Sequence, residues 1–229
     1  MVGVEVAEVA RAGAMVLRNR IDDAGAEVLE LRVNGVFVMD TAQTETEEAL
    51  ARTALGLVDR PRRVLVAGLG LGFTMHEVLA DPRVEHVRVV EVEDALVGWM
   101  RDGTIPHGPG FLADDRLEVV VADARQAIAE SRSATYDLVL LDVDNGPGFL
   151  VYEYNAALYQ AGFLRQVREV LRPGGALAVW SSAESAELQR ALGEVFGDVT
   201  TCRLPVTLQG RDESYWIYAS GRAGIASRS

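Results

Sequence analysis

Several carboxylates in this chain stand where an apolar run of strand length ends. They are Glu91, Asp123, Asp142 and, just beyond, Asp144. A carboxylate can accept hydrogen bonds from two sugar hydroxyls at once, and it can hold an amine and take up its proton. If these runs are neighbouring strands of a parallel sheet, their carboxyl ends meet at one edge, where such sheets bind ligands. The chain thus has the residue types for nucleoside binding and for proton transfer.

A glycine-rich turn follows another apolar run, Arg63 to Ala67. Its glycines are Gly68, Gly70 and Gly72. Glycine lets the backbone turn tightly and approach a ligand, and the helix expected around Met75 to Leu79 offers free N–H groups at its start. A dinucleotide turn has glycine at its first, third and sixth places, whereas the sixth place here is Phe73. The spacing therefore favours a nucleoside ligand without a pyrophosphate, and the alternative is a tight turn that binds nothing.

Two of the carboxylates have specific expected roles. Glu91 stands at the distance from the glycine turn at which an acidic side chain holds a ribose diol. Asp123 ends one strand and begins a helix, so it is either a plain N-cap or the acceptor for an adenine amino group, with the Ala124 N–H donating to a ring nitrogen. Both interpretations of Asp123 can hold together.

The loop from Asp142 to Gly148 is the second informative stretch. A buried strand delivers two carboxylates into a segment rich in glycine and proline, which indicates ligand handling. Asp142 is the expected base and Asp144 the reserve, because either could hold an attacking amine and accept its proton. The alternative is an Asx turn. Tyr154 and Asn155 follow, and they either close over a substrate or serve packing.

Composition excludes several classes of protein. The net charge of −12 and the absence of basic runs argue against nucleic acid as a partner and fit a cationic or amine substrate. No apolar segment is long enough to cross a bilayer, and the first residues lack the pattern of a leader, so we expect a cytoplasmic protein. The single cysteine and three histidines, which lack ligand spacing, predict no metal site.

The first part of the chain, residues 1–58, predicts a small antiparallel sheet and a linking helix. Asn34-Gly35 between two apolar runs is a strong signal for a type I′ hairpin. A helix is expected over Thr44 to Val58, with Thr44 and Glu47 forming a capping box. The sheet is too small for a core of its own, so we expect it to pack on the main domain or on another subunit in a homodimer or tetramer.

The second part, residues 59–220, alternates strand and helix patterns and ends in two strands joined by a short turn. This predicts a doubly wound α/β sheet, mostly parallel, with helices on both faces and an antiparallel terminal strand. One long helix is expected over Asn155 to Leu171. Residues 221–229 are expected to form a disordered tail.

From Leu31 to about Ala219 the chain resembles the spermidine synthase family, a branch of the class I S-adenosylmethionine (SAM)-dependent methyltransferase fold, which is Rossmann-like. The matching segments are the glycine turn, Val90-Glu91-Val92-Glu93, Asp114 to Leu117 before Ala122-Asp123-Ala124, Tyr136 to Asp142, and Leu171 to Gly175. The resemblance implies that Glu91 binds the ribose, that Asp123 binds the adenine, and that Asp142 activates the attacking amine.

The chain departs from the pattern of the aminopropyltransferases in this family. Leu71 stands where those enzymes usually carry an aspartate in the glycine turn, and Val38 stands where a glutamine lines the polyamine site. Glu47 stands near an expected aromatic residue, and Asn145 with Gly146 replaces the aspartate before the loop proline. Unpaired charge on a diamine would cost about 1 to 3 kcal/mol for each lost partner.

These departures leave several functions open. The first is a SAM-dependent methyltransferase of the spermidine synthase-like group acting on a small molecule. The alternative is an aminopropyltransferase of polyamine synthesis that uses decarboxylated SAM. A further alternative is a nucleoside-binding protein without catalytic activity, and Phe73 disfavours a dehydrogenase.

Overall fold

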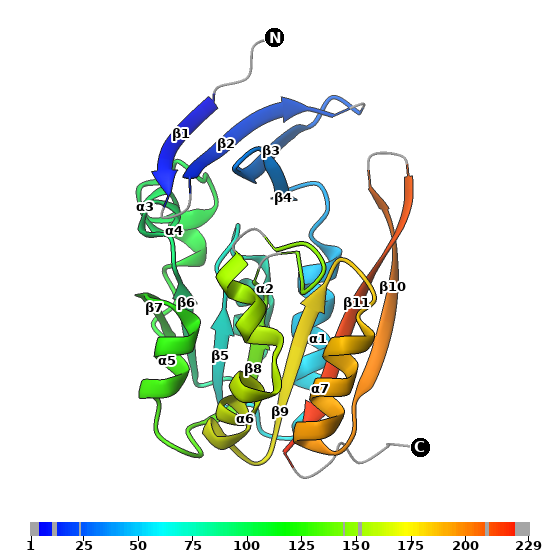
Figure 1. Ribbon diagram of the computed structural model, residues 1–229. Helices are drawn as coiled ribbons and strands as arrows, with labels where there is room; N and C mark the ends of the chain where they lie inside the picture. Colours follow the sequence, from blue (N-terminus) through cyan, green and yellow to red (C-terminus); the bar gives the residue numbers. More distant parts are fainter. Residues whose placement is uncertain are drawn as a thin grey trace.

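Two sheets organise the computed structural model, which describes residues 5–10, 13–22, 24–143, 145–150, 153–208 and 211–222 (Figure 1). The small sheet has the order β1-β2-β3-β4, with β1 (Glu5–Ala10), β2 (Gly13–Ile21), β3 (Glu27–Val33) and β4 (Val36–Asp40). The large sheet has the order β10-β11-β9-β8-β5-β6-β7. Its strands are β5 (Arg63–Ala67), β6 (His86–Glu91), β7 (Leu117–Val121), β8 (Tyr136–Leu141), β9 (Leu171–Ser181), β10 (Thr200–Leu208) and β11 (Arg211–Gly221).

The large sheet is parallel from β9 to β7 and antiparallel at its other edge. Each of the four pairs among β5, β6, β7, β8 and β9 is parallel, whereas β11 runs antiparallel to β9 and β10 antiparallel to β11. Strand β8 is buried along its whole length, as expected for a central strand covered on both faces. The mostly parallel sheet and its antiparallel terminal addition confirm the predicted fold class.

Helices cover both faces of the large sheet. They are α1 (Glu45–Leu57), α2 (Phe73–Ala80), α3 (Asp94–Asp102), α4 (Gly108–Phe111), α5 (Ala124–Glu130), the 3₁₀ helix η1 (Glu153–Tyr159), α6 (Ala161–Val170) and α7 (Ala186–Phe196). Alternate strand residues divide the core: Val64 and Val66 pack with α1, α2 and α3, whereas Leu65 and Ala67 pack with α5, α6 and α7. This alternation follows from the two-residue period of a strand.

The small sheet lies across the carboxyl ends of the parallel strands (Figure 1). Its inward residues Leu17, Leu31 and Val33 belong to the same apolar cluster as α1 and the strands β5, β6 and β8. The predicted hairpin is confirmed, because Asn34 and Gly35 both have positive φ, 53° and 77°, between the antiparallel strands β3 and β4. The sheet therefore closes the edge at which parallel sheets bind ligands.

Several elements differ from the sequence-based expectation. Strand β1 and helices α3 and α4 were not expected from the sequence pattern. The helix expected over Asn155 to Leu171 is interrupted, because η1 precedes α6 and Gln160 has extended backbone between them. Strand β11 includes Gly221, where the tail was expected to begin, and residues 223–229 lie outside the described ranges. No helix in the described part of the chain has the length and hydropathy needed to span a bilayer.

Candidate functional site

A cavity lies between the small sheet and the carboxyl ends of the parallel strands, and it encloses about 950 Å³ with its open mouth included. The small sheet contributes apolar walls, among them Leu31 and Met39. The strand ends contribute polar ones. The lining residues that can accept or donate hydrogen bonds through their side chains are Glu47, Glu91, Glu93, Asp123, Asp142, Tyr154, Asn155 and Trp180. Glu91, Asp123, Asp142 and their neighbours Gly68, Gly70 and Ala124 are thus brought together as the sequence analysis proposed.

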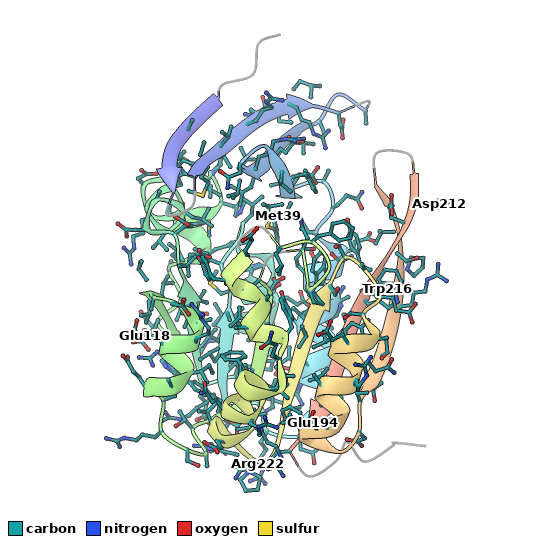
Figure 2. The ribbon with its side chains drawn as sticks, in the orientation of Figure 1. Met39, Glu118, Glu194, Asp212, Trp216 and Arg222 are labelled. Atoms are coloured by element: carbon teal, nitrogen blue, oxygen red, sulfur yellow. The ribbon has the colours of Figure 1, made fainter. Side chains whose placement is uncertain are left out.

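The glycine turn has the left-handed backbone that its composition predicts. Gly68, Gly70 and Gly72 have φ of 96°, 50° and 91°. A Cβ at Gly68 would lie 1.9 Å from the carbonyl oxygen of Asp142, so the turn touches the end of β8. Gly70 lies beneath the Met39 sulfur, which the Leu71 N–H approaches at 3.1 Å, and Figure 2 shows Met39 where the two sheets meet. Gly72 caps α2 and does not line the cavity.

Glu91 ties the glycine turn to the end of β6. Its two carboxylate oxygens accept from the backbone N–H groups of Leu69 at 2.9 Å and Glu93 at 2.8 Å. Burial raises the pKa of Glu91, and the hydrogen bonds from these N–H groups oppose that rise. Each oxygen keeps a second lone pair, so the carboxylate is fixed in place and can still accept from a diol.

Asp123 is both the N-cap of α5 and a wall of the cavity. Its carboxylate accepts from the Arg125 N–H at 2.8 Å and from the Arg125 guanidinium at 2.7 Å, and these bonds hold the pKa of Asp123 below its ordinary value. The Arg125 guanidinium lies 5.4 Å from the ring centre of Tyr154, on η1. The N-cap role is therefore present, and the adjoining Ala124 also lines the cavity.

Asp142 follows the end of β8 and is partly buried, with its carboxylate bonded to α2. Thr74, near the start of α2, donates its hydroxyl to the Asp142 Oδ2 at 2.5 Å. Burial raises the pKa of Asp142 to about 6, and the Thr74 hydrogen bond opposes that rise. A carboxyl with this pKa is largely ionised at neutral pH and can take a proton from an amine. Asp144, the reserve base of the sequence analysis, lies outside the described residues.

Glu47 is a cavity residue that the sequence analysis assigned to a capping box. The Thr44 hydroxyl instead bonds to Glu48 at 3.0 Å, and Glu47 is turned inward with 8% of its surface exposed. Its Oε2 accepts from the Thr46 hydroxyl at 2.6 Å. Burial raises the pKa of Glu47 to about 7, and the nearby charge of Asp142 adds to that rise. An acidic residue on the buried face of a predicted helix was the signal that could have identified it.

The loop after Asp142 is tied to the small sheet and to β9. The Asn145 amide donates to the Phe37 carbonyl at 3.2 Å, and the Asn145 carbonyl accepts from the Ser182 hydroxyl at 2.6 Å. Tyr154 and Asn155, farther along, line the cavity. The loop therefore connects the Asp142 end of the cavity to the small sheet that covers it.

The charged side chains among the described lining residues of the cavity are all acidic. Its lining includes five carboxylates, those of Glu47, Glu91, Glu93, Asp123 and Asp142, and no Arg, Lys or His among the described residues. Such a lining attracts cations and disfavours a ligand that brings its own carboxylate.

Comparison with known proteins identifies the family to which the chain belongs. Residues 43–196 match the family described as Spermine/spermidine synthase domain. Polyamine aminopropyltransferase 2 of Hyperthermus butylicus is 32% identical over an alignment of 217 positions, and the alignment covers 83% of this chain and 68% of that protein. Putrescine N-methyltransferase 3 of Nicotiana tabacum is 30% identical over an alignment of 159 positions, which covers 66% of this chain and 39% of that protein. This chain thus spans less than half of the tobacco protein.

A solved structure supports the fold independently. Spermidine synthase in complex with the transition state analogue AdoDATO matches 96% of this chain and 73% of its own, with a TM-score of 0.81 at 18% identity. The agreement covers both sheets, and it confirms the Rossmann-like architecture that the resemblance implies. The relatives named above are transferases, which confirms the predicted enzyme class at the level of the family.

Proposed function

The chain belongs to the spermine/spermidine synthase family, and from this premise we propose that it transfers an aminopropyl group from decarboxylated SAM to the amine of a small molecule. Methyl transfer, which the sequence analysis placed first, becomes the second candidate. The observation that carries this choice is the charge of the cavity, which bears five carboxylates and no basic side chain among its described lining residues.

The charge discriminates between the two donors. SAM carries a sulfonium, an ammonium and a carboxylate, whereas decarboxylated SAM carries only the two cations. A carboxylate buried in this cavity would meet other carboxylates and no described cationic side chain, which is costly in a medium of low polarity. The donor without a carboxylate is therefore the better match.

The order of the strands gives the donor a direction. Along the sheet Asp123 follows β7, Glu91 ends β6, the glycine turn follows β5, and Asp142 follows β8. Three strand spacings amount to about 14 Å, which suits an adenosine with a short extended chain. We assign the adenine to Asp123 and Ala124, the ribose to Glu91, and the reacting carbon to the region of Asp142.

The proposed reaction needs alignment and one proton acceptor. A neutral amine attacks the carbon next to the sulfonium, a C–N bond forms, and the C–S bond breaks with its electrons going to sulfur. The nitrogen then carries a surplus proton, which the Asp142 carboxylate accepts. The cover formed by the small sheet keeps bulk water from the reacting groups.

The test is incubation of the purified protein with decarboxylated SAM or SAM and a panel of diamines and monoamines, with mass spectrometry of the products. We expect aminopropylated amines from decarboxylated SAM and a slower reaction, or none, with SAM. Methylated products alone would overturn the proposal.

Methyl transfer from SAM is kept because two observations favour it. The tobacco relatives are putrescine N-methyltransferases, and Leu71 is fully buried in the core, so the glycine turn offers no side-chain carboxylate to an aminopropyl nitrogen. Calorimetric titration with the two donors separates the candidates, because the methyltransferase must bind SAM more tightly.

A further inference from the structure

Glu47 and Asp142 form a carboxyl pair that comes from two unrelated parts of the chain. Glu47 is on α1, Asp142 follows β8, and both line the cavity. Thr74 links them, because its hydroxyl donates to Asp142 at 2.5 Å and lies 3.4 Å from the backbone carbonyl oxygen of Glu47. Thr74 of α2 thus lies between Asp142 and the backbone of Glu47.

The other cavity carboxylates with described contacts are already engaged. Asp123 has the Arg125 guanidinium at 2.7 Å, and Glu91 has two backbone N–H groups. Glu47 and Asp142 accept from threonine hydroxyls and have no cationic partner among the described residues. A buried carboxylate without a cation is costly, so this pair is suited to a positive charge from outside the chain.

Trp180 provides independent evidence that something occupies this end of the cavity. It lies at the end of β9, next to β8 in the sheet, and lines the cavity. Its buried indole N–H has no hydrogen-bond partner within the described ranges of the chain. A buried donor without an acceptor costs about 1 to 3 kcal/mol, so the cavity is expected to hold a partner for it, as water or ligand.

Trp180 also has an aromatic neighbour on β11, a strand that packs against α1. Its ring packs edge-on against Tyr215 of β11 with ring centres 4.9 Å apart. Burial raises the pKa of the Tyr215 hydroxyl, and the charge of Glu47 on α1 adds to that rise. Aromatic rings next to carboxylates are a typical surrounding for an ammonium group.

We propose that Glu47, next to Asp142, binds the ammonium at the end of the donor's aminopropyl chain, and that Glu47 releases a proton when this ligand binds, while Asp142 remains the base for the attacking amine. The inference rests on the proposed function and adds a residue to it. Glu47 supplies, from the neighbouring helix α1, the acidic group that the glycine turn lacks at Leu71, whose side chain is buried in the core.

The surroundings of Glu47 determine the proton release. The titratable groups that face it from neighbouring elements are Asp142, Asp40 at the end of β4, and Tyr215. Asp40 is neutralised by Arg20 at 2.6 Å, so Asp142 is the unneutralised carboxylate beside Glu47. Burial raises the pKa of Glu47 to about 7, and an arriving ammonium lowers it again.

The test is calorimetric titration of decarboxylated SAM in two buffers of different ionisation enthalpy, which counts the protons released. At pH about 6.5 we expect the wild type to release a substantial part of one proton, and Glu47→Gln to release less than half as much. Affinity of Glu47→Gln for decarboxylated SAM should fall about tenfold or more, as for the loss of one charged hydrogen bond. Asp142→Asn, the second variant, should also lose affinity for this ligand.

Methylthioadenosine is the matched ligand, because it keeps the nucleoside and lacks the ammonium. Its affinity should change less than about twofold in Glu47→Gln, since Glu91 and Asp123 are untouched. Glu45→Gln, an exposed change of the same kind on the same helix, should behave like the wild type with both ligands. Equal losses for both ligands, or unchanged proton release in Glu47→Gln, would overturn the proposal.

Binding is measured without turnover, so the two proposals fail separately. A protein that binds decarboxylated SAM with Glu47-dependent proton release and forms no aminopropylated product would refute the proposed reaction and support the role of Glu47.

Discussion

Asp142 is the residue on which the proposed chemistry depends. Burial raises its pKa to about 6, and the base must be ionised to accept a proton, so activity is lost as the pH falls through this value. Because the attacking amine must also be neutral, we expect kcat/KM to rise more steeply with pH below about 6 than above it, and Asp142→Asn to lower kcat by about 100-fold or more and to remove this steeper limb of the profile. A pH profile from 5 to 8 measures both.

Thr74→Val serves as the control for this assignment. The Thr74 hydroxyl lowers the pKa of Asp142, so its loss should move the acidic limb to higher pH while turnover persists. If the acidic limb of the pH profile is unchanged in both Asp142→Asn and Thr74→Val, the role of Asp142 as the base is contradicted.

Glu47 should make stability depend on pH in the absence of ligand. Its folded pKa is about 7 against an ordinary value of 4.5, so folding favours the protonated form. The free energy of unfolding therefore falls as the pH rises from about 4.5 to about 7, by about 3 kcal/mol at most. We expect Glu47→Gln to be more stable than the wild type at pH 8 by up to this amount and no more stable near pH 4.5, as measured by urea unfolding.

The matched variant is again Glu45→Gln, which should show no such pH-dependent gain. A gain in Glu47→Gln that is the same at both pH values would mean that the Glu47 carboxyl is not protonated in the folded state.

Glu91 should control affinity for every adenosyl ligand. Glu91→Gln keeps the shape and puts an amide N–H where one oxygen accepts from Leu69 or Glu93. We expect both the diol contact and the turn to weaken, with affinity for methylthioadenosine about 10 to 100-fold lower. Glu118→Gln, on β7 and paired with Arg88 away from the cavity, is the control, and Figure 2 shows its position on the side of the molecule. Equal affinities in the two variants would refute the ribose assignment.

At the scale of elements, two glycines of the same turn are required for different reasons. At Gly68 a side chain would strike the backbone of Asp142, whereas at Gly70 it would strike the movable end of Met39. We expect Gly68→Ala to be much more damaging than Gly70→Ala, which should cost the roughly 1 to 2 kcal/mol of left-handed strain and a crowding term. A double-mutant cycle with Met39→Ala measures that term, because the crowding disappears when Met39 is shortened. Additive effects would show that Met39 does not contact the turn.

Elements with a strong local signal were predictable from the sequence. The Asn34-Gly35 hairpin, the glycine turn and the buried strand β8 have backbone or burial requirements that few residues satisfy. The interruption between η1 and α6 was not predictable, because the apolar period continues across Gln160 while its backbone is extended. Periodicity reports the buried face of a segment and leaves its continuity open.

For the candidate site, the positions of the strand-end carboxylates were predictable from the sequence, whereas the position of Glu47 was not. Glu91, Asp123 and Asp142 stand at strand ends, so the parallel sheet alone brings them together. Glu47 was assigned to a local capping role because a Thr followed three residues later by Glu fits that pattern. Its position in the cavity depends on how α1 packs against β8, β9 and β11, which only the tertiary structure shows.

At the scale of the whole molecule, the net charge has the same sign as the side chains that line the cavity. A net charge of −12 surrounds a cavity lined by carboxylates, which should concentrate cationic substrates near the mouth. We expect kcat/KM for a diamine to fall severalfold between about 50 and 300 mM salt, because the Debye length shortens, while the affinity for methylthioadenosine changes little. Steady-state rates at several ionic strengths test this, and equal sensitivity for both ligands would argue against steering by charge.

The contact between Gly68 and Asp142 has a wider consequence. The backbones of these two residues are in contact, and the Asp142 N–H also donates to the Ala67 carbonyl at 2.8 Å. The glycine turn, which we assign to the nucleoside, and Asp142, which we assign to the reaction, therefore cannot move independently. A substitution at either residue should therefore disturb both ends of the cavity. We expect changes of acceptor preference to come instead from substitutions of lining residues on β3 and β4, such as Leu31 and Val38, which leave the glycine turn in place.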